Sequence, residues 1–177
     1  MREFEKYPLV LILGASGTGK TTIFTELLGR LPNCVMIDAD IFWRDEFNTP
    51  ETNFLEFKRY CLKIAGHISQ NNVLVVYFLQ GTPDDFEQIS ERSSFSHLHY
   101  LFLVCEREEL VHRLKKKPKG WGLLEKNPDH LENLLHYNEH LKQIAQDSEI
   151  PVIDTSKSSV EEASNNIYTW ISSFLAG

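Results

Sequence analysis

Eight consecutive residues near the start of the chain have the types and the spacing of a phosphate-binding loop. They are Gly14-Ala15-Ser16-Gly17-Thr18-Gly19-Lys20-Thr21, which follow an apolar run and fit the pattern G-x-x-x-x-G-K-S/T. Glycines let the backbone approach a phosphate closely, and N–H groups at the start of a helix attract anions. We expect Lys20 to bridge the β and γ phosphates of a nucleotide and the Thr21 hydroxyl to ligate Mg²⁺, with Thr22 completing the nucleotide-binding set.

Two carboxylates, Asp38 and Asp40, follow the second apolar run of the sequence. Beside a phosphate site, one carboxylate can hold Mg²⁺, and the other can accept the proton of an attacking hydroxyl or orient that hydroxyl. Asp40 lies nearer the segment where an acceptor would sit, so we assign Asp40 the role of base and Asp38 a place beside the metal. The alternative is that one of the two only caps the next helix.

Residues after the second and third apolar runs are candidates for binding the acceptor of a transferred group. Trp43 offers a flat ring and Arg44 a cation, whereas Gln80 follows the third run and can hydrogen-bond a substrate. We therefore predict that Asp40, Trp43, Arg44 and Gln80 line the acceptor site. Packing in the core is an alternative role for Trp43 and for its neighbour Phe42.

One strongly basic cluster occurs in this acidic chain. Its cations are Arg113, Lys115, Lys116, Lys117 and Lys119. A cationic loop that closes over a phosphate site would exclude water and neutralise charge on a transferring group, and Arg113 is placed to reach in from a helix. Compensation of the dipole at a helix end is the alternative role for the lysines.

The loop after the last apolar run, from Asp154 to Ser158, is the remaining candidate. Loops in this position can border the base of a bound nucleotide, so we place Ser156 among the nucleotide-binding residues. Helix capping explains the serines of this loop equally well.

Apolar runs that alternate with helical patterns determine the expected fold. Strands are expected at Leu9–Leu13, Cys34–Ile37, Val73–Leu79, His99–Cys105 and Pro151–Ile153. Helices are expected at Thr21–Arg30, from Phe54 to Ile68, from Thr82 onward, at Glu106–Lys117, from Asn127 to about Gln146, and after the capping box of Ser159 and Glu162. This alternation predicts an α/β fold with a parallel sheet between two layers of helices, in which ligands bind beyond the carboxyl ends of the strands.

The composition of the 177 residues fits one globular domain, with 42% hydrophobic and 24% charged residues. The net charge of −7 argues against binding to nucleic acid or to an anionic membrane. The three cysteines form no Cys-x-x-Cys pair, no signal peptide is visible and no apolar run could span a bilayer. We expect a cytoplasmic protein that acts as a monomer or a homodimer.

With these motifs, nearly the whole chain resembles the P-loop kinase group that includes shikimate, gluconate, adenylate and chloramphenicol kinases. The resemblance rests on Gly14–Thr21, the pair Asp38 and Asp40, the stretch Leu110-x-x-Arg113-Leu114, and the ending Pro151–Ser156. It implies a three-layer P-loop NTPase fold with strand order 2-3-1-4-5, a small lid at about residues 115–130, and ATP with Mg²⁺. It also implies that Lys20 and Arg113 contact phosphates, that Asp40 lies near the acceptor hydroxyl, and that the loop after Ile153 lies beside the adenine.

The chain departs from the group's pattern in two places. Lysines follow Arg113 where lids of the group usually carry further arginines. After the third strand, Gln80-Gly81 replaces the glycine-rich or acidic signature that the group has there. The leading hypothesis is a kinase that transfers the γ-phosphoryl group of ATP to a hydroxyl of a small molecule, such as a nucleoside, a nucleotide, a sugar acid or an antibiotic. The alternative is a nucleotide-binding ATPase or switch protein without a small-molecule acceptor, although the sequence has no Asn-Lys-x-Asp motif for reading guanine.

Overall fold

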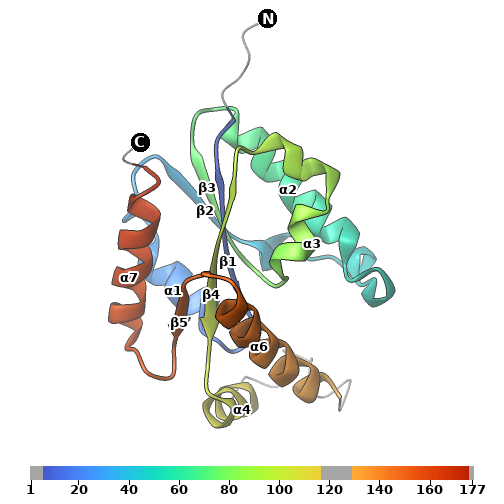
Figure 1. The fold of residues 1–177 in the computed structure, drawn as a ribbon, viewed down its shortest axis with the longest axis vertical. Helices are drawn as coiled ribbons and strands as arrows, with labels where there is room; N and C mark the ends of the chain where they lie inside the picture. Colours follow the sequence, from blue (N-terminus) through green and yellow to red (C-terminus); the bar gives the residue numbers. More distant parts are fainter. Residues whose placement is uncertain (1–5, 117–128, 176–177) are drawn as a thin grey trace, which may run out of the picture.

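The computed structural model describes residues 6–116 and 129–175. Its centre is a parallel sheet of five strands, in the order β2-β3-β1-β4-β5 (Figure 1). The strands are β1 (Leu9–Gly14), β2 (Cys34–Asp38), β3 (Leu74–Leu79), β4 (Leu98–Val104) and β5 (Val152–Asp154). The strand order predicted from the sequence is confirmed.

Six helices surround the sheet in the described part of the chain. They are α1 (Lys20–Leu27), α2 (Leu55–Ser69), α3 (Pro83–Glu87), α4 (Arg107–Lys115), α6 (His130–Asp147) and α7 (Val160–Ser172). Helices α1 and α7 pack on one face of the sheet, and α2, α3 and α6 pack on the other (Figure 1). The segment between β2 and α2 contains three short 3-10 turns, Ala39–Phe42, Asp45–Phe47 and Pro50–Thr52, which the sequence analysis did not anticipate.

The central strands are apolar because both faces of the sheet are covered. Every residue of β1 and β3 is buried, and β1 pairs with β3 on one side and with β4 on the other. Strands in this position read as continuous apolar runs rather than as alternating patterns. The register pairs Leu13 with Leu79 and Gly14 with Leu103. The residues that follow β1, β3 and β4 therefore emerge at the same edge of the sheet.

Most predicted elements are confirmed, with shifts of a few residues at their ends. The capping box of Ser159 and Glu162 forms as expected, and Thr82 starts α3 with a second box whose partner is Asp85. Helix α1 ends at Leu27 rather than near Arg30, because Leu28 leaves the helical conformation and Gly29 has a φ of 75°. Such boundary shifts are expected from sequence patterns alone.

The predicted lid, at about residues 115–130, lies largely outside the described residues. Of its lysines, Lys115 ends α4 and Lys116 follows it, whereas Lys117 and Lys119 lie outside the described ranges. Asn127 and Pro128 also lie outside them, and α6 begins at His130. In residues 6–116 and 129–175, no helix combines the length and the apolar character needed to cross a membrane.

Candidate functional site

The loop from Gly14 to Thr21 connects β1 to α1, and its glycines have two different structural roles. Gly17 and Gly19 have φ values of 91° and 95°, in the left-handed region that side chains other than glycine rarely adopt. Gly14 is needed for space, because a Cβ atom there would lie 2.6 Å from Thr18 Oγ1 and 2.7 Å from the carbonyl oxygen of Leu103. The motif thus needs glycine at Gly17 and Gly19 for the backbone conformation and at Gly14 for close packing.

Lys20 folds back over the loop that precedes it. Its Nζ donates hydrogen bonds to the carbonyl oxygens of Gly14 at 2.7 Å and Ala15 at 3.0 Å, and the residue is buried. The Thr18 hydroxyl also donates to the Ala15 oxygen, at 2.9 Å. The ammonium group therefore lies at the N-terminus of α1, which carries the positive end of the helix dipole. An anion bound at this loop would be attracted both by the Lys20 ammonium group and by the dipole of α1.

Asp38 connects the phosphate loop to the segment after β2. The Thr21 hydroxyl donates to Asp38 Oδ2 at 3.0 Å, and the backbone N–H of Asp40 donates to Asp38 Oδ1 at 3.2 Å. Asp38 is the N-cap of the 3-10 turn Ala39–Phe42, so the capping alternative holds for it alongside its contact with Thr21. A hydroxyl and a carboxylate are hard oxygen ligands, and this donor pair fits Mg²⁺.

Asp40 is exposed, and its neighbours Ala39 and Phe42 pack in the apolar cluster on the side of the sheet covered by α2. Burial, and to a lesser degree the charge of Asp40, raise the pKa of the Cys61 thiol on α2 to about 12. Asp38 thus contacts Thr21 on the phosphate loop through one carboxylate oxygen and the backbone of Asp40 through the other.

An aromatic cluster follows Asp40. The Trp43 ring packs edge-on against Phe54 and Phe57, with ring centres 5.9 Å and 5.2 Å away. The Arg44 guanidinium lies over the rings of Phe47 and Tyr60, and it pairs with Glu46 at 2.9 Å. Phe42 packs against Tyr60, as the core-packing alternative proposes for it. Trp43 is 41% exposed, so only part of its ring is used in packing.

Gln80 is exposed and directly follows β3. The next residue, Gly81, is held by Tyr137, which was not among the residues predicted from the sequence. The Tyr137 hydroxyl on α6 accepts a hydrogen bond from the N–H of Gly81 at 2.7 Å and lies 2.8 Å from the Gly81 carbonyl oxygen, to which it donates. Burial raises the pKa of this tyrosine, so the hydroxyl keeps the proton that it donates. Tyr137 was missed because a tyrosine on a helical stripe looks like an ordinary core residue.

Asp85 joins three segments on the same side of the sheet. Its carboxylate accepts hydrogen bonds from the Thr82 N–H at 2.7 Å and from Asn53 Nδ2 at 2.6 Å, and it pairs with Lys58 Nζ at 3.0 Å. Lys58 is buried, which lowers the pKa of its ammonium group, and Asp85 opposes this effect. The sequence indicated only that a helix starts at Thr82, which did not point to the contacts of Asp85 with Asn53 and Lys58.

Arg113 lies on α4 next to the loop after β5. Its guanidinium donates to Thr155 Oγ1 at 2.9 Å and to the Thr155 carbonyl oxygen at 2.8 Å, and its Nε pairs with Glu109 at 2.7 Å. The Thr155 hydroxyl in turn donates to the carbonyl oxygen of Thr18 at 2.9 Å. Arg113 is therefore linked to the phosphate loop through Thr155, a buried residue of the candidate loop Asp154–Ser158 for which the sequence predicted no role of its own.

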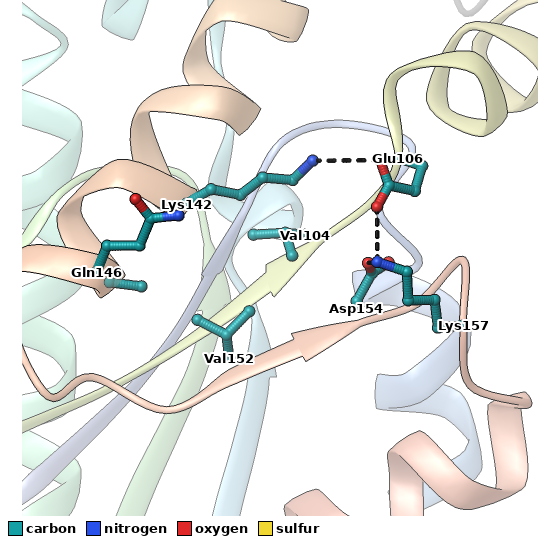
Figure 2. Close-up of a pocket in the computed structure, with 8 residues that line it drawn as sticks. Val104, Glu106, Lys142, Gln146, Val152, Asp154 and Lys157 are labelled. Carbon is teal, nitrogen blue, oxygen red and sulfur yellow. Dashed lines mark hydrogen bonds and ion pairs between the residues drawn. The ribbon is translucent and has the colours of Figure 1, made fainter.

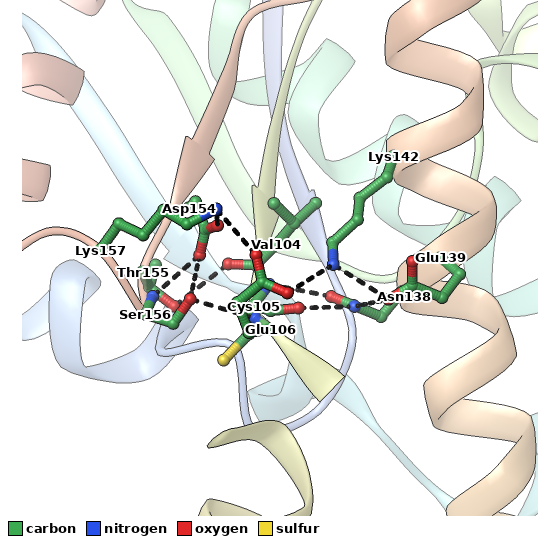
Figure 3. Close-up of polar contacts among 10 residues, drawn as sticks. All are labelled: Val104, Cys105, Glu106, Asn138, Glu139, Lys142, Asp154, Thr155, Ser156 and Lys157. Atoms are coloured by element: carbon green, nitrogen blue, oxygen red, sulfur yellow. Dashed lines mark hydrogen bonds and ion pairs between the residues drawn. The ribbon is translucent and has the colours of Figure 1, made fainter. Parts of the chain in front are cut away.

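Ser156 stabilises the contact between the loops after β4 and β5 (Figure 3). Its hydroxyl accepts a hydrogen bond from the Glu106 N–H at 3.1 Å, and both its N–H and its hydroxyl contact Asp154 Oδ1. Burial alone would raise the pKa of Asp154, but hydrogen bonds from Ser156 and Lys157 outweigh it and lower that pKa.

Figure 3 also shows Asn138 of α6, which is fully buried. Its side-chain amide forms hydrogen bonds with both the N–H and the carbonyl of Cys105.

A cleft of about 340 Å³ opens between α6 and the ends of β4 and β5 (Figure 2). Val104 and Val152 lie at its apolar part, and charged side chains surround it. Lys157 pairs with Glu106 at 2.7 Å and with Asp154 at 3.1 Å, whereas Lys142 lies 3.9 Å from Glu106. The cleft adjoins the loop that contains Ser156, on the α6 face of the sheet.

Comparison with solved structures finds the same fold in several small-molecule kinases. A sugar kinase from Janibacter has a TM-score of 0.68 and 16% identity, with 95% of each chain covered. A shikimate kinase from Bacteroides thetaiotaomicron has a TM-score of 0.62 and 15% identity, covering 95% of this chain and 99% of its own. A deoxyadenosine kinase from M. mycoides has a TM-score of 0.57 and 18% identity, covering 93% and 98%.

At these identities the likeness establishes the fold, and the P-loop kinase fold predicted from the sequence is confirmed. No protein-family model matches the sequence, and a search of curated proteins finds no match. The activity must therefore be inferred from the residues of the site itself.

Proposed function

We propose that this chain is an ATP-dependent kinase that transfers the γ-phosphoryl group to a hydroxyl of a small molecule. The observation that carries the proposal is the set of contacts that Asp38 makes. Its carboxylate lies 3.0 Å from the Thr21 hydroxyl of the phosphate loop and accepts the backbone N–H of the exposed Asp40 at 3.2 Å. These residues offer a phosphate-binding loop, oxygen ligands for a metal and a carboxylate base, which are the parts that phosphoryl transfer requires.

In the proposed reaction the acceptor hydroxyl oxygen attacks the γ-phosphorus of ATP. A new O–P bond forms, and the bond from the γ-phosphorus to the β,γ-bridging oxygen breaks. ADP leaves with the electron pair of that bond, and the proton of the acceptor hydroxyl goes to the Asp40 carboxylate. Lys20 and the N–H groups of the loop bind the phosphates, and most of the catalysis comes from positioning and charge neutralisation.

Thr21 and Asp38 are the residues that would hold Mg²⁺, directly or through water. Both supply oxygen atoms, and their 3.0 Å contact already brings these atoms together at the start of α1. When bound, the metal ion neutralises charge on the phosphate oxygens. Arg113 and Ser156 are proposed to lie beside the nucleotide, since the contact from Arg113 through Thr155 to Thr18 runs along the phosphate loop.

The decisive experiment is replacement of Asp40 by Asn. This change keeps the shape of the side chain and removes the base, so we expect kcat for transfer to fall by about 10²- to 10⁴-fold. The affinity for ATP, measured by calorimetry, should stay close to that of the wild type because the phosphate loop is untouched. Asp45→Asn is the matched control, since it removes an exposed carboxylate five residues farther along the chain.

Two outcomes would contradict the proposal. If Asp40→Asn transfers phosphoryl groups at the wild-type rate, Asp40 is not the base. If the wild-type protein binds ATP and hydrolyses it slowly at a rate independent of any hydroxyl acceptor in a broad panel, the chain is an ATPase or a switch protein instead.

A further inference from the structure

Exposed apolar side chains occur in the segment that follows Asp40, and the N–H of Trp43 donates a hydrogen bond to the Asp40 carbonyl oxygen at 3.1 Å. Trp43 is 41% exposed, Ile41 72% and Leu55 40%. All three belong to the segments between β2 and the start of α2, which follow Asp40 in the chain. We call Ile41, Trp43 and Leu55 the apolar wall. Exposed apolar groups beside a reactive group are typical of ligand-binding surfaces.

The ring of Trp43 is held in a defined orientation. Phe54 and Phe57 contact it edge-on, at interplanar angles of 61° and 73°. Phe54 itself has a φ of 57°, which is rare for a bulky residue, and its N–H is held by the Thr49 carbonyl at 3.1 Å. The preceding Asn53 is bound to Asp85. A fixed indole with an exposed part can stack on a flat group at little cost in conformational entropy.

The cations between residues 39 and 69, a range that the structure describes in full, already have carboxylate partners. Four lysine and arginine residues occur between residues 39 and 69, and their ion pairs are Arg44–Glu46 at 2.9 Å, Lys58–Asp85 at 3.0 Å, Arg59–Glu91 at 3.1 Å and Lys63–Glu91 at 3.5 Å. A carboxylate or phosphate on the acceptor would have to share one of these cations with a carboxylate of the protein, which weakens its recognition. Asp38 and Asp40 add negative charge to the site, which disfavours an anionic acceptor further.

From these observations we infer that the acceptor is an uncharged alcohol with a flat ring, which stacks on Trp43 while its hydroxyl meets Asp40. This inference rests on the proposed kinase function and narrows its substrate class. Among the acceptors compatible with the sequence, it favours nucleosides and ring-bearing antibiotics over nucleotides and sugar acids. Trp43 is thereby assigned as the residue that determines specificity.

The test measures acceptor binding and turnover separately, with three groups of compounds. The first group contains neutral ring-bearing alcohols, such as nucleosides and aryl diols. The second contains ring-bearing alcohols that also carry a carboxylate or a phosphate, and the third contains neutral polyols without a flat ring. Binding is measured by calorimetry in the presence of Mg²⁺ and a non-hydrolysable ATP analogue, and turnover is measured with ATP.

We expect the tightest binding and the highest kcat/KM in the first group, by at least about tenfold over the other two. Trp43→Ala should weaken binding of the best acceptor by about tenfold, whereas Trp43→Phe, which keeps a flat ring, should weaken it by less than about threefold. Leu28→Ala is the control, because Leu28 is an exposed apolar residue at the far end of α1. Equal melting temperatures of the variants would show that they fold alike.

The two proposals fail in different ways. Tightest binding in the second or third group, or unchanged affinity in Trp43→Ala, overturns the inference about the acceptor, whatever the turnover shows. Tight, Trp43-dependent binding of the first group without phosphoryl transfer to any compound overturns the kinase function and leaves the assignment of the binding surface supported.

Discussion

At the scale of single residues, the phosphate loop depends on glycines for different physical reasons. Gly17 and Gly19 supply left-handed backbone conformations, and Gly14 leaves room for Thr18 and for the backbone of β4. The sequence motif predicts that a glycine is needed at Gly14 and Gly19 without saying which property is used. Packing around Gly14 became visible only when β4 was placed beside β1.

Gly14→Ala should therefore damage the loop. A Cβ atom 2.7 Å from the Leu103 carbonyl oxygen cannot be accommodated by a side-chain movement, so we expect a loss of about 1–3 kcal/mol in unfolding free energy and weaker ATP binding. Urea denaturation and calorimetry measure the two effects.

Gly66→Ala is the matched control for this substitution. Gly66 lies inside α2, and a Cβ atom there would meet Ser94 at an ordinary contact distance of 3.5 Å. Because alanine has a higher helix propensity than glycine, the unfolding free energy of this variant should rise by about 0.5–1 kcal/mol. Equal effects of the two changes would contradict the packing role of Gly14.

At the scale of elements, α6 holds the ends of two strands. Adjacent residues of the helix contact different loops, with Tyr137 bound to Gly81 after β3 and Asn138 bound to Cys105 after β4. Since β1 lies between β3 and β4, the helix fixes the loops on both sides of the phosphate loop. Helix α6 therefore positions Gln80 relative to the nucleotide side of the site.

Tyr137→Phe tests this positioning role. The change removes one hydroxyl and leaves the N–H and the carbonyl of Gly81 without that partner, so unfolding free energy should fall by about 1–3 kcal/mol. We also expect KM for the acceptor to rise while ATP affinity is retained, because Gly81 follows β3 and not the phosphate loop. Tyr168→Phe on α7 is the control, since phenylalanine keeps the ring that faces Arg30. A parallel change in both substrates' affinities would show a general structural defect instead.

The Arg59–Glu91 pair connects α2 to the turn Ser90–Ser94 and predicts a pH dependence of stability. Hydrogen bonds from Arg59 lower the pKa of Glu91 to about 2, below the ordinary value of 4.5. A carboxylate whose pKa is lower in the folded state contributes stability above its unfolded pKa and loses it as the pH falls through the folded value.

Glu91→Gln should therefore melt at a lower temperature than the wild type at pH 7, and the difference should shrink below about pH 4.5 and vanish near pH 2. Melting curves over this pH range measure the effect. Glu132→Gln is the control, because its pair with Arg107 is half exposed and contributes little. If the melting temperatures of Glu91→Gln and the wild type differ by the same amount down to pH 2, the Arg59–Glu91 pair is not the cause of the difference.

At the scale of the whole molecule, the sequence predicted the fold well because the signals for it are local. Each strand consists mainly of an apolar run, and alternation with helices requires parallel crossovers. The strand order came from the resemblance carried by Gly14–Thr21 and the motifs that follow it. The loop Gly14–Thr21 and Asp38 could likewise be predicted as site candidates from the sequence, because their residues are adjacent in sequence or follow directly on a strand.

The parts of the site that were missed depend on contacts between distant residues. Tyr137 and Gly81 are 56 positions apart, and Thr155 and Thr18 are 137 apart. The three 3-10 turns before α2 have no periodic pattern, so the apolar wall could not be anticipated as a surface. Whether such residues meet depends on the packing of the helices, which no local pattern encodes.

The strand order also has a consequence for how the chain is made. Strand β1 occupies the centre of the sheet, yet both its neighbours, β3 and β4, are synthesised about 60 to 90 residues later. A ribosome needs several seconds to add that many residues, during which the apolar run Leu9–Leu13 has no strand to pair with. Native pairs of such high sequence separation also fold slowly. The nascent chain therefore cannot form the central pairing of its sheet until β3 has emerged.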